Sequence, residues 1–276
     1  MDLNTVSEVA RPSTRDEIPN WSDSDAWLAG GTWLFSEPQP DVRRLIDLEG
    51  LGWESLLVHE PGLSIAATCT ISRLYGLVAP PEWTAAPLIR QCCQSLLASF
   101  KIWNTATVGG NICMSLPAGA MISLTAALDG VCTIWPREGG ERRVRVVDFV
   151  TGVHQNVLGP GDLLRSIDLP AYALHKRTSL RRQSLTHLGR SSVLLIGTLC
   201  PREGTMAITI TASTVRPIRF EFPGVPADDE LRSKLQEGIP DAWYVDDVHG
   251  TPDYRKHLTL YLAEDIREEL SAGGSV

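Results

Sequence analysis

The stretch WLAGGTWL, residues Trp27–Leu34, has a counterpart later in the chain, ATVGGNIC, residues Ala106–Cys113. In each, a glycine pair follows apolar, strand-like residues and precedes a small polar residue, Thr32 or Asn111. Adjacent glycines permit positive φ and let the backbone approach a ligand more closely than a β-carbon allows. Two such turns on facing strand ends could hold both phosphates of an extended dinucleotide. Taken alone, either stretch is better explained as an ordinary tight turn.

The composition describes a globular protein and excludes several functions. The chain has 276 residues, of which 43% are hydrophobic and 21% are charged, and its net charge is −8. At ~100–200 residues per domain, this length fits one large domain or two modest ones. The chain contains no block of Lys and Arg, so neither a nucleic acid nor an anionic membrane is expected as a partner. No apolar run approaches the ~20 residues of a membrane span. The N-terminal residues contain no apolar stretch, so we expect no secretory signal there.

The cysteines and histidines predict no metal site. The six cysteines form no CxxC pair, and the six histidines show no metal-binding spacing. Most of the cysteines have apolar neighbours, which is typical of small buried side chains in a reducing compartment. We therefore expect a cytoplasmic protein with free thiols.

Periodicity places the two glycine stretches within a mixed fold. Strands are expected before the first stretch and over much of 131–170, and an amphipathic helix is expected over 86–102. A second helix is expected within 118–130, with Gly130 as its cap. Residues 191–214 predict an antiparallel hairpin. The last helix is expected to begin at Thr251 and to bury the stripe Tyr254, Leu258, Leu262, Ile266 and Leu270.

The common nucleotide and hydrolase motifs are absent. The sequence contains no G-x-G-x-x-G that opens a helix, no G-x-x-x-x-G-K-[ST] and no G-x-S-x-G. A classical dinucleotide-binding fold, a P-loop and a nucleophile elbow are therefore disfavoured.

The order of motifs along the chain resembles one family. AGGTWL is followed by SIAATCTISRL, LLASFKIWNTATVGGNI, RRVRVVDFVTGV and GDLLRSIDLP, and then by TASTVRP and HGTPDYRKHL. This order resembles the FAD-binding medium subunit of the molybdenum hydroxylases, the family of xanthine dehydrogenase and carbon monoxide dehydrogenase flavoproteins. The resemblance implies an α+β fold, with a two-lobed FAD-binding domain of the vanillyl-alcohol-oxidase type over 1–170. A C-terminal flavoprotein domain of antiparallel sheet and helices is implied over 171–276.

The resemblance also implies which residues contact the FAD. By motif, they are Ala29, Gly30, Gly31, Thr32, Trp33 and Leu34 in the first stretch, Thr107, Val108, Gly109, Gly110 and Asn111 in the second, and Ala98, Ala120, Leu164 and Arg182 elsewhere. Leu164 is equally compatible with a plain core position and Arg182 with a solvated surface charge. The family usually has an Asp where this chain has Ala120, so one acceptor for the cofactor is missing unless Ser115 or a water replaces it.

The resemblance implies an oxidoreductase subunit without catalytic residues of its own. A molybdopterin-binding large subunit would oxidise the substrate, an iron–sulfur small subunit would relay electrons, and FAD on this chain would pass them to NAD, oxygen or another acceptor. Two alternatives remain open. One is a free-standing FAD oxidoreductase, for which ~105 residues after the junction leave little room for a substrate domain. The other is a degenerate assembly subunit that has lost its FAD, which the missing Asp at Ala120 would suit.

Overall fold

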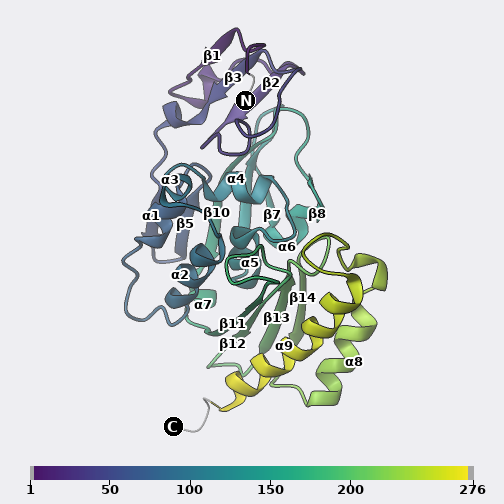
Figure 1. Ribbon diagram of the computed structural model, residues 1–276. Coiled ribbons are helices and arrows are strands. Elements are labelled where there is room, and N and C mark those ends of the chain that lie inside the picture. The colour runs from purple at the N-terminus through teal and green to yellow at the C-terminus, as the bar shows by residue number, and fades with distance from the viewer. Residues whose placement is uncertain (1–2, 273–276) are drawn as a thin grey trace.

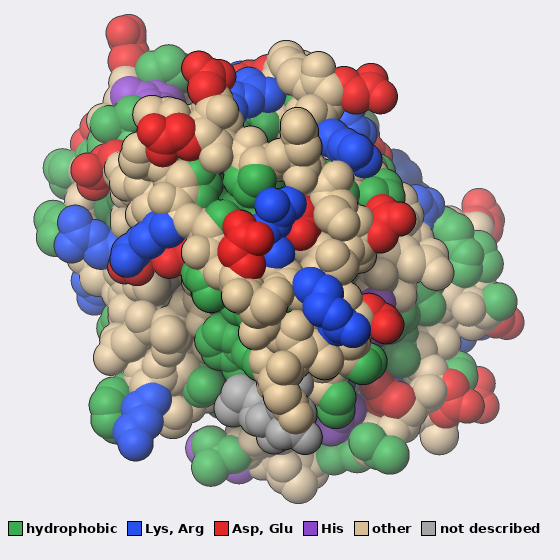
Figure 2. Space-filling model, turned by 90° about the horizontal axis from the view of Figure 1, so that it is seen from above, with side chains coloured by type: hydrophobic (Ala, Val, Ile, Leu, Met, Phe, Trp, Pro, Cys, Tyr) green, Lys and Arg blue, Asp and Glu red, His purple; other side chains and the backbone are tan. Residues whose placement is uncertain are grey.

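The computed structural model describes residues 3–272. Three main sheets follow one another along the molecule, with the N-terminal sheet at one end and the C-terminal helices at the other (Figure 1). The chain is thus a mixed α/β protein. Viewed from above in Figure 2, this face carries Lys and Arg side chains interspersed with Asp and Glu.

The N-terminal sheet is small and parallel, and it positions the first glycine stretch. Its strands are β1 (Glu8–Ala10), β3 (Arg44–Asp47) and β2 (Asp25–Leu28), in that order. Asp25 fixes the start of β2, because its carboxylate accepts from the Ser22 N–H at 2.7 Å and pairs with Arg44 at 2.7 Å. Burial raises the pKa of Asp25, but the bonds from Arg44 and Ser22 outweigh it, so the pKa lies below its ordinary value. The first glycine stretch begins within the last two residues of β2, and its glycine pair follows the end of the strand.

The middle of the molecule is an antiparallel sheet covered by helices. Its strands, in spatial order, are β4 (Leu56–His59), β5 (Gly62–Ala66), β10 (Leu163–Pro170), β6 (Val131–Trp135) and β7 (Arg142–Arg145). The helices of this region are α1 (Ile71–Tyr75), α2 (Ala86–Ser95), α3 (Phe100–Trp103), α4 (Val108–Cys113), α5 (Ala120–Ala127) and α6 (Val146–Phe149). A short hairpin, β8 (Val150–Gly152) with β9 (Gln155–Asn156), follows α6. Every residue of α5 is buried, which makes α5 the central helix of the core.

The C-terminal part is a four-stranded antiparallel sheet that packs on α5. After α7 (Ala171–Leu174), the strands β11 (Arg177–Gln183), β12 (Val193–Leu199), β13 (Met206–Thr211) and β14 (Ile218–Phe222) pair in sequence order. Helices α8 (Asp228–Gly238) and α9 (Pro252–Ala272) complete it. Leu194 and Ile196 of β12 belong to the same hydrophobic cluster as α5. One hydrophobic cluster therefore spans residue 170, and the domain division placed there stays a prediction.

Three expected helix features differ in the structure. The helix expected over 86–102 ends at Ser95, because Leu96 is extended and its carbonyl accepts from the Trp103 indole N–H at 3.0 Å. In α9 the buried positions are Arg255, Thr259, Ala263, Ile266 and Leu270, so the predicted stripe is partly wrong. The tertiary contacts of an arginine shift the buried face of this helix by one residue at its N-terminal end.

The end of α5 is also built differently from the prediction. Asp129, with φ 54°, takes the left-handed conformation expected of a glycine cap, and Gly130 follows it and donates to the Thr125 carbonyl at 2.7 Å. The Asp129 carboxylate is held in place by Lys176 at 2.6 Å and Arg219 at 3.0 Å. This junction cluster ties α5 to the C-terminal sheet.

Candidate functional site

The first glycine stretch forms an open loop of backbone amides. Gly31 has φ 67°, and its carbonyl accepts from the Phe35 N–H at 2.8 Å. Ser36 N–H donates to the Trp33 carbonyl at 2.8 Å and closes the next turn. The backbone N–H groups of residues 30–34 donate to no acceptor among residues 3–272. The loop thus presents a run of amide donors, as predicted, that an anion could satisfy.

The second glycine stretch is a helix rather than a tight turn, so that prediction was wrong. Thr107 caps α4, since its hydroxyl accepts from the Gly110 N–H at 3.0 Å. The N–H groups of Val108 and Gly109 donate to the carbonyls of Cys69 at 2.8 Å and Ala67 at 3.0 Å. A β-carbon on Gly109 would lie 2.7 Å from the Ala67 Cα, so glycine is required here for close packing. The amides at the start of α4 are therefore used within the protein.

Asn111 joins α4 to the start of α5. Its side-chain oxygen accepts from the Met121 N–H at 3.0 Å, which fixes the orientation of the amide group. The Asn111 side-chain nitrogen makes no hydrogen bond to any of the residues that the structure describes. It is the side-chain donor that this segment can offer to a ligand.

The two glycine stretches touch each other. A β-carbon on Gly30 would lie 1.8 Å from the Thr105 carbonyl oxygen and 3.2 Å from the Ala106 Cα, so the first loop packs directly on the chain that enters α4. On its other side, the Trp33 ring lies 5.5 Å from the His154 ring. The first loop is thereby held between the second stretch and the β8–β9 hairpin.

Three further non-glycine residues are held at positive φ, and one of them, His154, lies beside this loop. They are Ser115 at 51°, His154 at 56° and Ala212 at 64°. His154 N–H donates to the Ser115 carbonyl at 3.0 Å, and Ala212 N–H donates to the Pro117 carbonyl at 2.7 Å. Such conformations persist only where surrounding contacts enforce them, and they concentrate at functional sites. Apart from Ser115, proposed as a substitute acceptor, these residues could not be predicted from the sequence, because no local residue pattern marks a left-handed alanine or histidine.

Ser115 is occupied within the protein. Its hydroxyl is buried, lies 3.2 Å from the Ile112 carbonyl and accepts from the Asn156 side-chain nitrogen at 3.2 Å. Ala120, the position of the missing Asp, is completely buried at the first residue of α5. With these partners, Ser115 is poorly placed to serve as the substitute acceptor.

The other predicted residues lie outside the contact between the two stretches. Ala98 is half-buried between α2 and α3. Leu164 is buried in β10, opposite Ile134 of β6, which is the plain core position. Arg182 is half-buried, and it donates from Nε to the Ser191 hydroxyl at 2.8 Å and from Nη2 to the Gly189 carbonyl. Burial lowers the pKa of Arg182. Its bonds brace the β11–β12 connection, so it is not a freely solvated charge.

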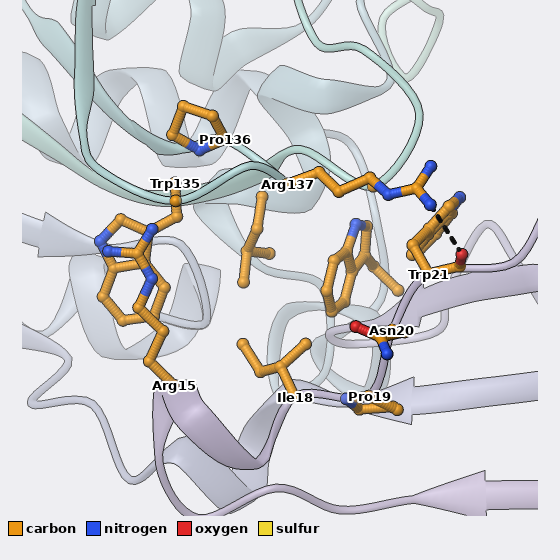
Figure 3. Close-up of a pocket in the computed structure, with 12 residues that line it drawn as sticks. Arg15, Ile18, Pro19, Asn20, Trp21, Trp135, Pro136 and Arg137 are labelled. Atoms are coloured by element: carbon orange, nitrogen blue, oxygen red, sulfur yellow. Dashed lines mark hydrogen bonds between the residues drawn. The ribbon is translucent and has the colours of Figure 1, made fainter.

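A separate cavity lies between the N-terminal segment and the β6–β7 turn. Its volume is about 180 Å³, and in Figure 3 Ile18 and Asn20 face Trp135 and Arg137 across it. Arg15 stacks over the Trp135 ring at 4.6 Å. None of the residues predicted to contact FAD lines this cavity. It is therefore distinct from the amide loop.

Comparison with known proteins shows the family of this chain. Residues 5–172 match the family described as the FAD binding domain in molybdopterin dehydrogenase. The chain belongs to this family, and its cofactor is FAD. The residues fit that cofactor, because the unused amides of 30–34 suit its negatively charged diphosphate.

Solved structures share the fold over nearly the whole chain. A cyanide-inactivated Cu,Mo-CO dehydrogenase aligns with a TM-score of 0.79 and 22% identity, over 96% of this chain and 97% of that chain. A carbon monoxide dehydrogenase from Hydrogenophaga pseudoflava aligns with a TM-score of 0.79 and 18% identity, over 96% of this chain and 97% of that chain. Quinoline 2-oxidoreductase from Pseudomonas putida 86 aligns with a TM-score of 0.78 and 19% identity, over 100% of both chains. No curated protein sequence matches the chain significantly.

The described part of the chain shows neither a metal-binding cluster nor a membrane-spanning helix. Residues 3–272 contain no group of three or more His, Cys, Asp or Glu side chains that could hold a metal ion. Among the helices described, none is long and apolar enough to cross a membrane.

Proposed function

We propose that this chain is the FAD-binding electron-transfer subunit of a molybdenum hydroxylase. It would receive electrons from iron–sulfur clusters of a partner subunit and pass them to an external acceptor. The observation that carries the proposal is the run of unused amides at 30–34, packed against the second glycine stretch. The FAD supplies the redox chemistry, accepting electrons and releasing them.

The residues of this chain would bind and orient the cofactor. The amides of 30–34 would donate to the diphosphate, which needs no charged side chain when several backbone dipoles converge. The side-chain nitrogen of Asn111 would donate to a neighbouring oxygen of the cofactor, while its oxygen holds the start of α5. The exposed Trp33 ring, beside His154, would shield one side of the loop from water.

The proposal includes two partners that this chain does not contain. They are a molybdopterin-binding large subunit and an iron–sulfur small subunit, and the acceptor would be NAD, oxygen or another oxidant. Support comes from proteins of the same fold, carbon monoxide dehydrogenases and a quinoline oxidoreductase. The substrate, whether a purine, an aldehyde, carbon monoxide or an N-heterocycle, would bind to the large subunit. The six free cysteines support a cytoplasmic location.

Co-expression tests the proposal. The chain is produced alone and together with any molybdopterin-binding and iron–sulfur subunits that neighbouring genes encode. Alone, it should bind FAD non-covalently, since neither His nor Cys lies within 29–35, and it should reduce no acceptor from any of these substrates. The complex should show substrate-dependent reduction of the flavin. Turnover of a substrate by the single chain would favour a free-standing oxidoreductase, and a chain that never binds FAD would favour a degenerate subunit.

A further inference from the structure

Among the described residues, Arg255 has the largest fully buried side chain, although this side chain carries a charge. It lies in the first turn of α9, and 1% of its surface is exposed. In Figure 1 this end of α9 lies toward the middle of the molecule, and the other end points toward the C-terminus. A buried guanidinium requires several acceptors, because an unpaired buried charge is strongly destabilising.

Four acceptors from three separate segments surround Arg255. Its Nη1 donates to the carbonyls of Ser192 at 2.5 Å and Ala212 at 2.7 Å. Its Nε donates to the Gly250 carbonyl at 3.1 Å, and its Nη2 pairs with the Asp247 carboxylate at 2.5 Å. The planar fork of the guanidinium fixes the relative positions of these segments, which a lysine ammonium cannot do.

The Ser192 carbonyl lies at the base of the β11–β12 connection. Ser192 N–H donates to the Gln183 carbonyl at 2.8 Å and closes this connection. The neighbouring Ser191 hydroxyl accepts from Arg182, one of the residues predicted to contact FAD. Arg255 therefore braces the segment that holds Arg182.

The Ala212 carbonyl leads to the start of α5. Ala212 is buried at φ 64°, a conformation that is unfavourable for alanine and needs support. Arg255 donates to the Ala212 carbonyl, and the Ala212 N–H donates to the Pro117 carbonyl in the turn before α5. That turn leads to Ala120 and to Met121, whose N–H binds Asn111.

We propose that Arg255 is a positioning residue for the FAD site. It acts through Ser192 and Ala212, which connect the C-terminal helix to the hydrogen-bond partner of Arg182 and to the turn before Ala120. This inference rests on the proposed function. The affinity for FAD would then depend on a side chain in α9. Among the described residues, this side chain makes no hydrogen bond to either glycine stretch.

The test measures FAD affinity and thermal stability separately in the full chain. Arg255→Lys keeps the charge but loses the fork, and we expect the Kd for FAD, followed by flavin fluorescence, to rise by about tenfold or more. Ile266→Ala is the matched control, because Ile266 is buried in the same helix against Gly197 of β12 and belongs to the separate C-terminal cluster. It should lower the melting temperature while the Kd changes by less than about twofold.

A rescue distinguishes positioning from general stability. Glycine takes positive φ freely, so Ala212→Gly added to Arg255→Lys should recover much of the lost FAD affinity. A melting temperature that recovers without the affinity would overturn the proposal, as would a wild-type Kd in Arg255→Lys or an equal loss in Ile266→Ala. If Arg255→Lys is insoluble, Asp247→Asn replaces it, with a smaller rise in Kd expected and an unchanged Kd counting against the proposal. Failure of wild-type FAD binding would instead contradict the proposed function.

Discussion

Gly30→Ala should weaken FAD binding, because the added methyl group would push the first loop away from the chain that enters α4. The new β-carbon would lie 1.8 Å from the Thr105 carbonyl oxygen and 2.7 Å from the Thr105 carbonyl carbon. Real β-carbons do not approach other atoms closer than 3.0 Å, and both obstacles belong to the backbone. The loop must therefore separate from the segment that enters α4. At Gly31, by contrast, the nearest atoms belong to the Phe35 side chain, which can move, so an alanine there would be strained mainly by the φ of 67°.

The size of the effect follows from this separation. Overpacking in a close contact typically costs ~1–3 kcal/mol. If FAD binds only when the two stretches are in contact, the free energy of binding becomes less favourable by this amount, and the Kd for FAD rises ~5- to 150-fold. The fold should lose little, because the loop is on the surface and its amides make no bonds to the protein that would be broken. We expect the melting temperature of the FAD-free protein to fall by less than ~4 °C.

Titration of the FAD-free protein with FAD, followed by the change in flavin fluorescence, measures the Kd. Gly76→Ala is the matched control, since a β-carbon there meets nothing closer than 3.4 Å and its φ of −79° suits alanine. The control should bind FAD like the wild type. A wild-type Kd in Gly30→Ala would refute the reasoning, because the two stretches could then separate without consequence for the cofactor.

Three further predictions concern stability and reactivity. Asp129→Asn keeps a residue that tolerates positive φ but removes the negative charge between the largely buried cations Lys176 and Arg219. The free energy of unfolding, measured by urea denaturation, should fall by about 2–3 kcal/mol. This is at the low end for a broken buried pair, because 19% of the carboxylate side chain is exposed. Asp25→Asn should destabilise the protein at pH 7, and the difference from wild type should shrink as the pH falls below about 4, because the lowered pKa of Asp25 stabilises the fold only above that range. Burial raises the pKa of Cys69 to about 12, so at pH 8 the native protein should react with Ellman's reagent first at the half-buried Cys200, and an early reaction of Cys69 would mean that the core opens readily.

The first glycine stretch could be predicted from the sequence because its conformation is determined locally. A short strand, a glycine pair and a polar residue predict an open turn with free amides, and the structure shows φ 67° at Gly31 and no protein acceptor for the amides of 30–34 among the described residues. Glycine freedom and the end of a strand are both local properties. The match of 5–172 to one family likewise agrees with the order of motifs in the sequence.

The second stretch was predicted incorrectly because its conformation depends on distant residues. Its glycines allow a turn, but Thr107 caps a helix, and the carbonyls of Cys69 and Ala67 take up the first amides. A sequence pattern does not show which distant carbonyls will be available. The same reason hides the buried Arg255, whose acceptors come from three segments, and the left-handed Ala212 that it supports.

Ala120 is where the sequence comparison and the structure lead to different expectations, and Ala120→Asp decides between them. The family's Asp would restore an acceptor for the cofactor, so FAD binding should be unchanged or tighter. In the structure, however, Ala120 is completely buried, and a carboxylate there would be desolvated. Its pKa would rise, and the FAD-free protein should lose more stability at pH 8 than at pH 5, where the carboxyl group can take up a proton. The start of α5 favours a negative charge and should limit this loss. We expect the rise in melting temperature caused by FAD to be at least as large as in the wild type, because the cofactor would supply the carboxylate with hydrogen bonds. A smaller rise would mean that position 120 does not face the cofactor, and that its alanine is a core residue rather than a lost ligand.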